Sequence, residues 1–458
     1  MMNTTRSSTQ SSTQSSARSS ARSSAEGTRG AAKAPAGAAP VLGTRALNRA
    51  TLERQLLLRR SADLSVKDAV AHLLGLQAQN VKPPYYALAA RLENFDPLEL
   101  SALMEAREAV RIVTMRSTIH LHTAEDALAL RPMMQPALER EMATVFRKGL
   151  VGVDLEELAV LAREAVEAEP RTMKQLREVL LVRWPDADPQ SLAIAARCVL
   201  PLVQVTPRGL WRRSGQVALT TLEHWLGDGA GERRPVRGGA SGSAVDALVL
   251  GGAPGSAVDA LVLGGASGSA VDALVPGGAS GSAVDALVPG GASGSAVDAL
   301  VPGGAPASAV DATVLRYLAA FGPASVKDMQ TWARLTRLRE VFERLRPGLR
   351  TYRDENGVEL FDLPDAPRPD ADTPAPPRFL PEFDNLLLSH ADRARVVPAE
   401  YKGRTWKGNF AYCVFLLDGF LGGVWRLEED AKGGGAVLTI EPFGRVSRAE
   451  RELSLIHV

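Results

Sequence analysis

The sequence predicts an α+β fold of three tandem winged helix-turn-helix motifs followed by a small C-terminal β-barrel-like domain. Two observations predict this fold. A capped amphipathic helix, a further helix and a β-rich hairpin occur in that order three times along the chain. After a linker rich in proline and aspartate, the helical period gives way to strand-like runs that continue almost to the end.

Composition limits the classes of protein to consider. The chain has 458 residues, of which 45% are apolar and 23% charged, and its net charge is +1. This is a globular composition with no global basic field, so any nucleic-acid binding must come from local basic patches. Cys198 and Cys413 lie in apolar patterns and are predicted to be buried free thiols, which fits a reducing compartment. We expect a cytoplasmic, nucleoid-associated monomer without a membrane span or a cofactor.

The predicted organisation follows from shifts in composition. It comprises a disordered Ser/Thr/Gln/Arg tail (1–43), a winged-helix unit (44–123), a helical connector with a second unit (124–228), a repeat linker (229–302), a third unit (303–363), a Pro-rich linker (364–377) and a C-terminal β domain (378–458). The tail resembles a transit peptide in composition, but a disordered tail or a misassigned start codon explains it more simply.

The first unit contains four expected helices and a hairpin. Asn48 caps a helix that runs through Arg60, and Ser65 caps the next helix. Two further helices are expected at 85–92 and 97–107. The β-rich runs 110–115 and 118–122 then flank the polar pair Arg116-Ser117, which predicts a hairpin.

The second and third units repeat this pattern. Thr172 and Ser325 each begin a helix with the order cap, apolar residue, Lys, polar residue that also follows Ser65. In the second unit a helix is expected at 189–200, with strands from 202 to 220 around a tip at 207–209. The third unit has an expected helix at 336–345 and a hairpin, 349–353 with 358–363, whose Asn356-Gly357 is a strong turn signal.

A tandem repeat separates the second and third units. Copies of a Gly-Gly-Ala-led segment start at Gly238 and recur with a period of 13, and a divergent sixth copy starts at Gly303. The sixth copy continues into the first helix of the third unit, so the five upstream copies resemble slipped duplications of that helix start. The glycines and prolines at the joints predict a flexible linker rather than a β-helix.

Deleting residues 238–302 should therefore leave folding and DNA binding intact. Thermal melting and a duplex-binding titration of the deletion variant would check this expectation. A large fall in melting temperature would show that the repeats are structural.

The C-terminal domain is predicted from strand-like runs. They lie at 379–388, 411–417, 420–427 and 436–440, and Asp418-Gly419 joins the second run to the third as a hairpin turn. A helix start is expected at 447–450, close to the end of the sequence.

The joint between the second and third helices of the first unit carries the most suggestive polar residues. Gln77 and Gln79 are one residue apart, so on an extended segment their side chains point to the same side. Two amides would then face one small target, such as a water molecule or a base edge. The plainer alternative is ordinary polar capping or solvated surface at a helix end.

Several separated motifs together resemble the AlkZ/YcaQ-type winged-helix DNA glycosylases. They are Leu76-Gln77-Ala78-Gln79, Arg116-Ser117-Thr118-Ile119-His120-Leu121, Leu380-Pro381-Glu382-Phe383-Asp384-Asn385-Leu386-Leu387-Leu388-Ser389-His390, and Leu417-Asp418-Gly419 with Gly423-Val424-Trp425-Arg426. The resemblance covers roughly residues 45–228 and 305–445. It implies three winged-helix motifs, a C-terminal β-barrel, a concave DNA channel and excision of N-alkylated purines, with crosslink unhooking in some members.

The same resemblance assigns the catalytic Gln-x-Gln signature to Gln77 and Gln79, and it maps the hairpin that approaches DNA onto residues 112–122. A glutamine cannot act as a general base near neutral pH, since its amide only donates and accepts hydrogen bonds. Its carbonyl can orient a water and face a cationic sugar. Such modest assistance suffices when an alkylated purine already carries positive charge and leaves readily.

Duplex DNA with alkylated bases is the expected partner, bound through phosphate contacts. The candidate contacts are Lys67, Lys82, Arg111, Arg116, Thr118, His120, Lys174, Lys327 and Arg337. For each charge the alternative is an ordinary solvated surface residue.

His120 and His122 share one strand face, but no third ligand is near in sequence, so we expect no metal. Asp384, Ser389 and His390 resemble a hydrolase triad, which we discount because no nucleophile elbow is present.

Two other functions stay open on the sequence. One is a non-catalytic winged-helix DNA-binding protein or transcriptional regulator. The other is a degenerate paralogue that the repeat insertion leaves inert.

Overall fold

The computed structural model describes residues 39–227, 307–407, 410–429 and 436–447. The predicted 1–43 tail lies outside these ranges except for its last residues, and so do the repeat linker and the helix start at 447–450 beyond Ser447. The described residues belong to one unit of contacts that begins at Ala39. The predicted domain boundaries therefore stay predictions.

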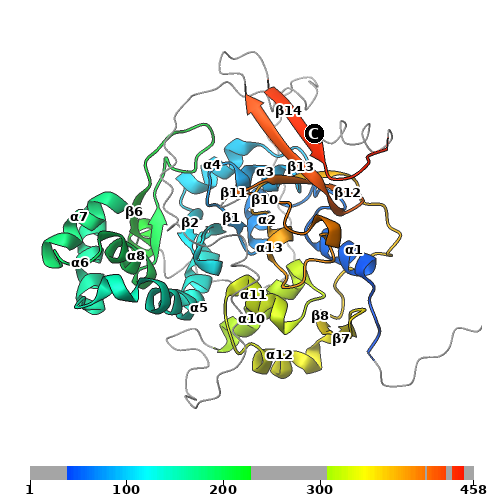
Figure 1. Ribbon diagram of the computed structural model, residues 1–458, viewed down its shortest axis with the longest axis horizontal. Coiled ribbons are helices and arrows are strands. Elements are labelled where there is room, and N and C mark those ends of the chain that lie inside the picture. Colours follow the sequence, from blue (N-terminus) through cyan, green and yellow to red (C-terminus); the bar gives the residue numbers. More distant parts are fainter. Residues whose placement is uncertain (1–38, 228–306, 408–409, 430–435, 448–458) are drawn as a thin grey trace, which may run out of the picture. The chain divides into compact units, whose positions relative to one another are not determined.

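The first unit has the predicted helices and hairpin (Figure 1). Its elements are α1 Thr44–Arg54, α2 Val66–His72, β1 Leu76–Gln77, α3 Pro83–Ala89, α4 Pro97–Glu105, β2 Ala109–Val113 and β3 Ile119–Thr123. The Ser65 side chain accepts a hydrogen bond from the Asp68 amide and caps α2 as expected. Asn48 does not cap α1 as predicted, since the helix begins at Thr44 and Asn48 lies inside it. Helix α1 ends at Arg54 rather than near Arg60, and the chain turns there with Leu56 at a φ of 57°.

The connector and second unit are mostly helical. They comprise α5 Ala124–Glu141, α6 Leu155–Ala168, β4 Arg171–Thr172, α7 Met173–Arg183, α8 Pro189–Val199, β5 Leu202–Gln204, β6 Ala218–Thr221 and α9 Leu222–Leu226. Thr172 and Gln175 form a full capping box at the start of α7. Helices α6, α7 and α8 pack on one another beside β6 around buried residues that include Leu158, Leu176 and Leu192 (Figure 1).

The strands of the first two units form one continuous antiparallel sheet. Its order is β1-β3-β2-β5-β6-β4, and β2 meets β5 where Arg111 pairs with Gln204 and Ile112 with Val203. The two hairpins are therefore joined edge to edge rather than forming separate wings. Strand β1, which contains Gln77, lies at one edge of this sheet.

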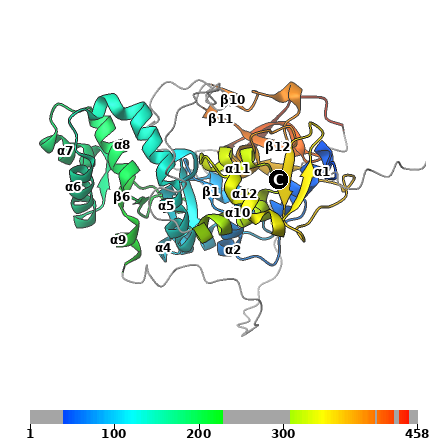
Figure 2. The same ribbon diagram turned by 90° about the horizontal axis from the view of Figure 1, so that it is seen from below.

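The third unit comprises α10 Ala307–Phe321, α11 Val326–Ala333, α12 Arg339–Leu345, β7 Arg350–Arg353 and β8 Glu359–Asp362. The sixth repeat copy thus does become its first helix, as predicted. Ser325 and Asp328 form a capping box on α11. The rings of Tyr317, Phe321 and Trp332 contact one another in the buried core of this unit. Figure 2 shows its helices α10, α11 and α12 from below.

The C-terminal region contains β9 Arg378–Leu380, α13 Asn385–Leu388, β10 Trp406–Lys407, β11 Phe410–Ala411, β12 Cys413–Leu417, β13 Phe420–Glu429 and β14 Ala436–Pro442. The order β14-β13-β12-β9 is an open sheet, so the expected barrel does not close within the described residues. The expected strand-like run 379–388 is also wrong in its second half. There Asp384 accepts a hydrogen bond from the Leu386 amide and starts α13.

Buried ion pairs connect α1 and the segment just after α3 to later parts of the chain. Arg91 pairs with Asp384 at 2.8 Å, and Arg54 pairs with Asp362 at 2.6 Å, with all four side chains 0% exposed. Such pairs are costly to break, since removal of one partner leaves a buried charge. They fix the C-terminal region and the third unit against the first unit.

Within the described ranges, no helix is both long enough and apolar enough to cross a membrane.

Candidate functional site

The two glutamines lie where β1 meets β3. Gln77 is paired with His120 in the sheet register and is 6% exposed, whereas Gln79 is half-buried. The Ala78 amide between them donates to the Ile119 carbonyl at 2.7 Å, which extends the pairing past the strand end. Both amide side chains contact the β2–β3 hairpin: Gln77 Oε1 accepts from Arg116 Nη2 at 3.0 Å, and Gln79 Oε1 accepts from the Ile119 amide at 3.3 Å.

The close approach of β1 to β3 depends on Gly75. Its φ is +89°, a conformation that L side chains rarely adopt. A Cβ at this position would lie 2.3 Å from His122 Nδ1 and 2.8 Å from the Leu121 carbonyl oxygen. Only glycine fits there without displacing the Gln77 strand or the buried histidine.

Arg116 occupies the turn of the hairpin. Arg116 and Ser117 have φ values of 55° and 58°, which non-glycine residues rarely adopt. The Arg116 guanidinium donates to Gln77 Oε1, to His120 Nε2 at 3.0 Å and to the Trp332 carbonyl at 2.9 Å. Burial, followed by the positive charges of Arg393 and Arg334, lowers the pKa of Arg116 to about 9. The group therefore keeps its charge at neutral pH.

The two histidines of β3 are neutral and fully buried. Burial, with the charge of Arg116, holds the pKa of His120 well below its usual range, and burial lowers the pKa of His122 to about 4. His122 Nε2 contacts Thr114 Oγ1 at 2.8 Å, and the two rings stack with centroids 5.7 Å apart. The part of the chain that the structure describes contains no cluster of three or more His, Cys, Asp or Glu side chains able to hold a metal.

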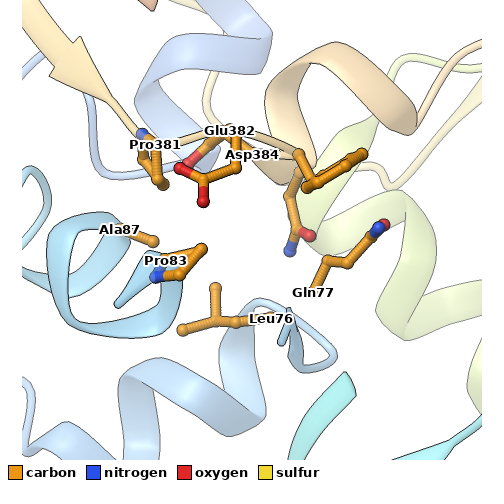
Figure 3. Close-up of a pocket in the computed structure, with 9 residues that line it drawn as sticks. Leu76, Gln77, Pro83, Ala87, Pro381, Glu382 and Asp384 are labelled. Atoms are coloured by element: carbon orange, nitrogen blue, oxygen red, sulfur yellow. The ribbon is translucent and has the colours of Figure 1, made fainter. Parts of the chain in front are cut away.

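A narrow crevice runs along Gln77 between the first unit and the C-terminal region (Figure 3). It encloses about 170 Å³, part of which is open solvent. Its lining residues are Leu76, Gln77, Pro83, Ala87, Pro381, Glu382, Phe383, Asp384 and Asn385. The crevice is therefore too narrow to be a chamber for a flipped-out base.

Glu382 and Asn385 belong to this site although the sequence reasoning did not select them. Glu382 accepts from Asn80 Nδ2 at 3.0 Å and from Cys413 Sγ at 3.1 Å. Cys413 is half-buried rather than buried as predicted, and this partial burial raises the pKa of its thiol. Asn385 Nδ2 donates to the Gly75 carbonyl at 2.8 Å. Their position beside Asp384 in a motif of the family resemblance was the available signal.

The discounted triad does not assemble. Asp384 pairs with Arg91, the Ser389 hydroxyl donates to the Asn385 carbonyl, and His390 Nε2 contacts the Phe321 carbonyl at 2.9 Å. Each polar group thus has a separate structural partner.

The predicted DNA contacts divide by exposure. Lys82, Lys174, Lys327 and Arg337 are exposed. Lys67 is half-buried and bonds Glu108 and Glu125 at 2.9 and 3.2 Å, and the Thr118 hydroxyl donates to the Met115 carbonyl. Arg111 and His120 are 2% and 0% exposed, and Arg111 donates to the Ala78 carbonyl at 2.7 Å. This burial favours a structural role for both residues, so phosphate contact is better expected from the exposed group.

Comparison with known protein families places the chain in a class of DNA-acting enzymes. A model of the DNA glycosylase AlkZ-like family matches residues 70–275 and 273–454, so the chain belongs to this family. The resemblance inferred from the motifs is thereby confirmed.

Among solved structures, the chain is similar to the Streptomyces sahachiroi DNA glycosylase AlkZ. The TM-score is 0.61 at 16% sequence identity, over 91% of this chain and 96% of that chain. At this identity the likeness shows the fold. Among curated protein sequences, none matches this chain significantly.

Proposed function

We propose that this protein is a monofunctional DNA glycosylase that hydrolyses the N-glycosidic bond of cationic alkylated purines in duplex DNA and also unhooks interstrand crosslinks. The observation that carries the proposal is the pair of amides, Gln77 and Gln79, held against one hairpin, with Gln77 also lining a narrow crevice. The proposal includes a winged-helix arrangement of the three helix-and-hairpin units around the DNA.

The amides suit a reaction whose leaving group is already activated. Each glutamine carbonyl accepts one hydrogen bond from the hairpin and keeps a second lone pair for a water. A water oriented in this way attacks the sugar as the bond to the cationic purine breaks, through an oxocarbenium-like transition state. Because no side chain has to take a proton before the bond breaks, a carboxylate general base is not required.

The narrowness of the crevice also bears on the kind of lesion. Enzymes that flip a base out of the helix need a closed pocket to receive it. The crevice beside Gln77 is narrow and partly open to solvent. A lesion that stays at the DNA surface, including a crosslink, would meet the amides there without entering a chamber.

The deciding experiment is incubation of the protein with duplex DNA that carries 7-methylguanine, followed by detection of the released base. Release of 7-methylguanine supports the glycosylase assignment. Tight duplex binding without release from any alkylated substrate would favour the alternative, a non-catalytic DNA-binding protein. That alternative draws support from the 6% exposure of Gln77 and its bond to Arg116, which are also the signs of a structural amide.

Lys327 offers a direct test of phosphate contact, since it is exposed on the first turn of α11. We expect Lys327→Gln to weaken duplex binding equally for all sequences and to reduce the slope of log K against log salt by about one. Titrations at several salt concentrations would measure both effects. Arg339→Gln, at an exposed position on α12, is the control. An unchanged salt slope for Lys327→Gln would show that Lys327 faces solvent and does not contact a phosphate.

A further inference from the structure

We propose that Arg116 and His120 are positioning residues that fix the amide of Gln77, rather than contacts to DNA. The inference rests on the proposed function, because it concerns the residue that we assign to water orientation. It changes the expectation from the sequence, in which Arg116 and His120 were both candidate phosphate contacts.

The orientation of the Gln77 amide follows from its partner. Arg116 Nη2 can only donate, so the atom that it meets at 3.0 Å must be the amide oxygen. A charged donor makes this bond stronger than one from a neutral group. The amide is thereby prevented from flipping, and the position of its remaining lone pair is fixed relative to the crevice.

The Arg116 side chain is held in place without a carboxylate. Its three hydrogen bonds go to neutral acceptors: Gln77 Oε1, His120 Nε2 and the Trp332 carbonyl. Trp332 lies in the last turn of α11, Val326–Ala333, where carbonyls lack helical partners and the helix dipole favours a cation. The guanidinium therefore links the third unit directly to the candidate catalytic glutamine.

His120 completes the arrangement through its tautomer. Its Nδ1 lies 3.0 Å from the Thr118 carbonyl, which can only accept, so Nδ1 carries the proton. Nε2 is then left as the acceptor for Arg116. Because His120 is also opposite Gln77 in the β1–β3 register, one residue fixes both the strand and the guanidinium.

The turn geometry adds an independent observation. Arg116 and Ser117 both lie in the left-handed region, where Asn and Gly are the usual residues of such hairpin turns. Backbone strain of this kind persists where surrounding contacts hold it, and it gathers at functional sites. Here it directs the Arg116 side chain back onto β1 and α11.

The test separates DNA affinity from the bond-breaking rate. For Arg116→Met, we expect single-turnover release of 7-methylguanine at saturating protein to fall at least tenfold, with the duplex Kd within about twofold of the wild type. Arg116→Lys should also be slow, because one ammonium cannot reproduce the geometry of the guanidinium. If either variant binds the duplex with a larger Kd but releases the base at the normal rate at saturation, Arg116 is a phosphate contact and the proposal is overturned.

His120 supplies a rescue pair. In His120→Gln the side-chain oxygen can replace Nε2 as the acceptor, whereas His120→Leu removes it. We expect the Gln variant to keep most of the rate and the Leu variant to lose it, and equal rates in the two would contradict the proposal. Arg131→Met is the control, since Arg131 is buried and donates to the Cys198 and Leu200 carbonyls rather than to Gln77.

Failure of the inference and failure of the proposed function give different results. If the wild-type protein releases no base from any alkylated duplex, the glycosylase assignment fails first. If the wild type is active and Arg116→Met matches it in both rate and Kd, only the positioning role is lost.

Discussion

Gln77→Ala is expected to lower the single-turnover rate of 7-methylguanine release by about a hundredfold or more, the usual loss when one preorganised polar group of an active site is removed. Gln79→Ala should act in the same direction. Both carbonyls lie at the β1–β3 junction, where Arg116 and the Ile119 amide hold them. The rate is measured with protein in excess over DNA, so that it reports bond breaking rather than product release.

Duplex affinity should change little in these variants, since neither glutamine carries charge. Gln216→Ala is a matched control, because Gln216 is exposed on the loop before β6 and has no part in the crevice. Normal release by both Gln77→Ala and Gln79→Ala would remove the amide pair from the mechanism. If only Gln79→Ala loses base-release activity, Gln79 orients the water and Gln77 has a structural role.

The local features of this fold were accessible from the sequence. Ser65, Thr172 and Ser325 each cap the helix that was predicted to follow them, because capping depends on residues only three positions apart. The β2–β3 hairpin and the helix formed from the sixth repeat copy are also present as predicted. These elements depend on short-range patterns.

The features that the sequence did not predict depend on long-range pairing. Strand β1 is two residues long and exists because Gln77 meets His120, more than forty positions later. The joining of two hairpins into one sheet rests on β2 pairing with β5, which no local pattern indicates. Helix α13 replaced an expected strand because Asp384 caps it while pairing with Arg91.

The candidate site was predicted only in part for the same reason. A Gln-x-Gln pattern identifies two amides, but their partners come from the hairpin turn and from α11. Arg116 and His120 looked like DNA contacts in sequence, since a basic residue in a hairpin is usually exposed. In the structure His120 is buried and Arg116 is half-buried, and α11 packs over the turn in a tertiary contact between the first and third units.

The second large expected effect concerns the buried ion pair that joins Asp384 in the crevice wall to Arg91, just after α3. Asp384→Asn should destabilise the protein by about 3–5 kcal/mol, since it leaves the Arg91 guanidinium charged and buried without its partner. Asparagine keeps the cap on α13, because it also accepts from a backbone amide at the helix start. The substitution thus isolates the charge, and urea unfolding measures the change.

Two comparisons make this result interpretable. The double variant Arg91→Met with Asp384→Leu should recover much of the loss, because apolar residues of similar size often replace a buried pair without penalty. Arg339→Gln, in an exposed pair with Glu343, should unfold almost as the wild type does. An unfolding midpoint unchanged by Asp384→Asn would show that Arg91 finds other acceptors, of which the Ala87 carbonyl at 3.0 Å is the nearest.

Base release should also be measured for Asp384→Asn, because Asp384 and Asn385 line the crevice. If the ion pair is only structural, base release should slow only under conditions that unfold the protein. Slow release by a folded Asp384→Asn protein would instead show that the carboxylate takes a direct part in the site.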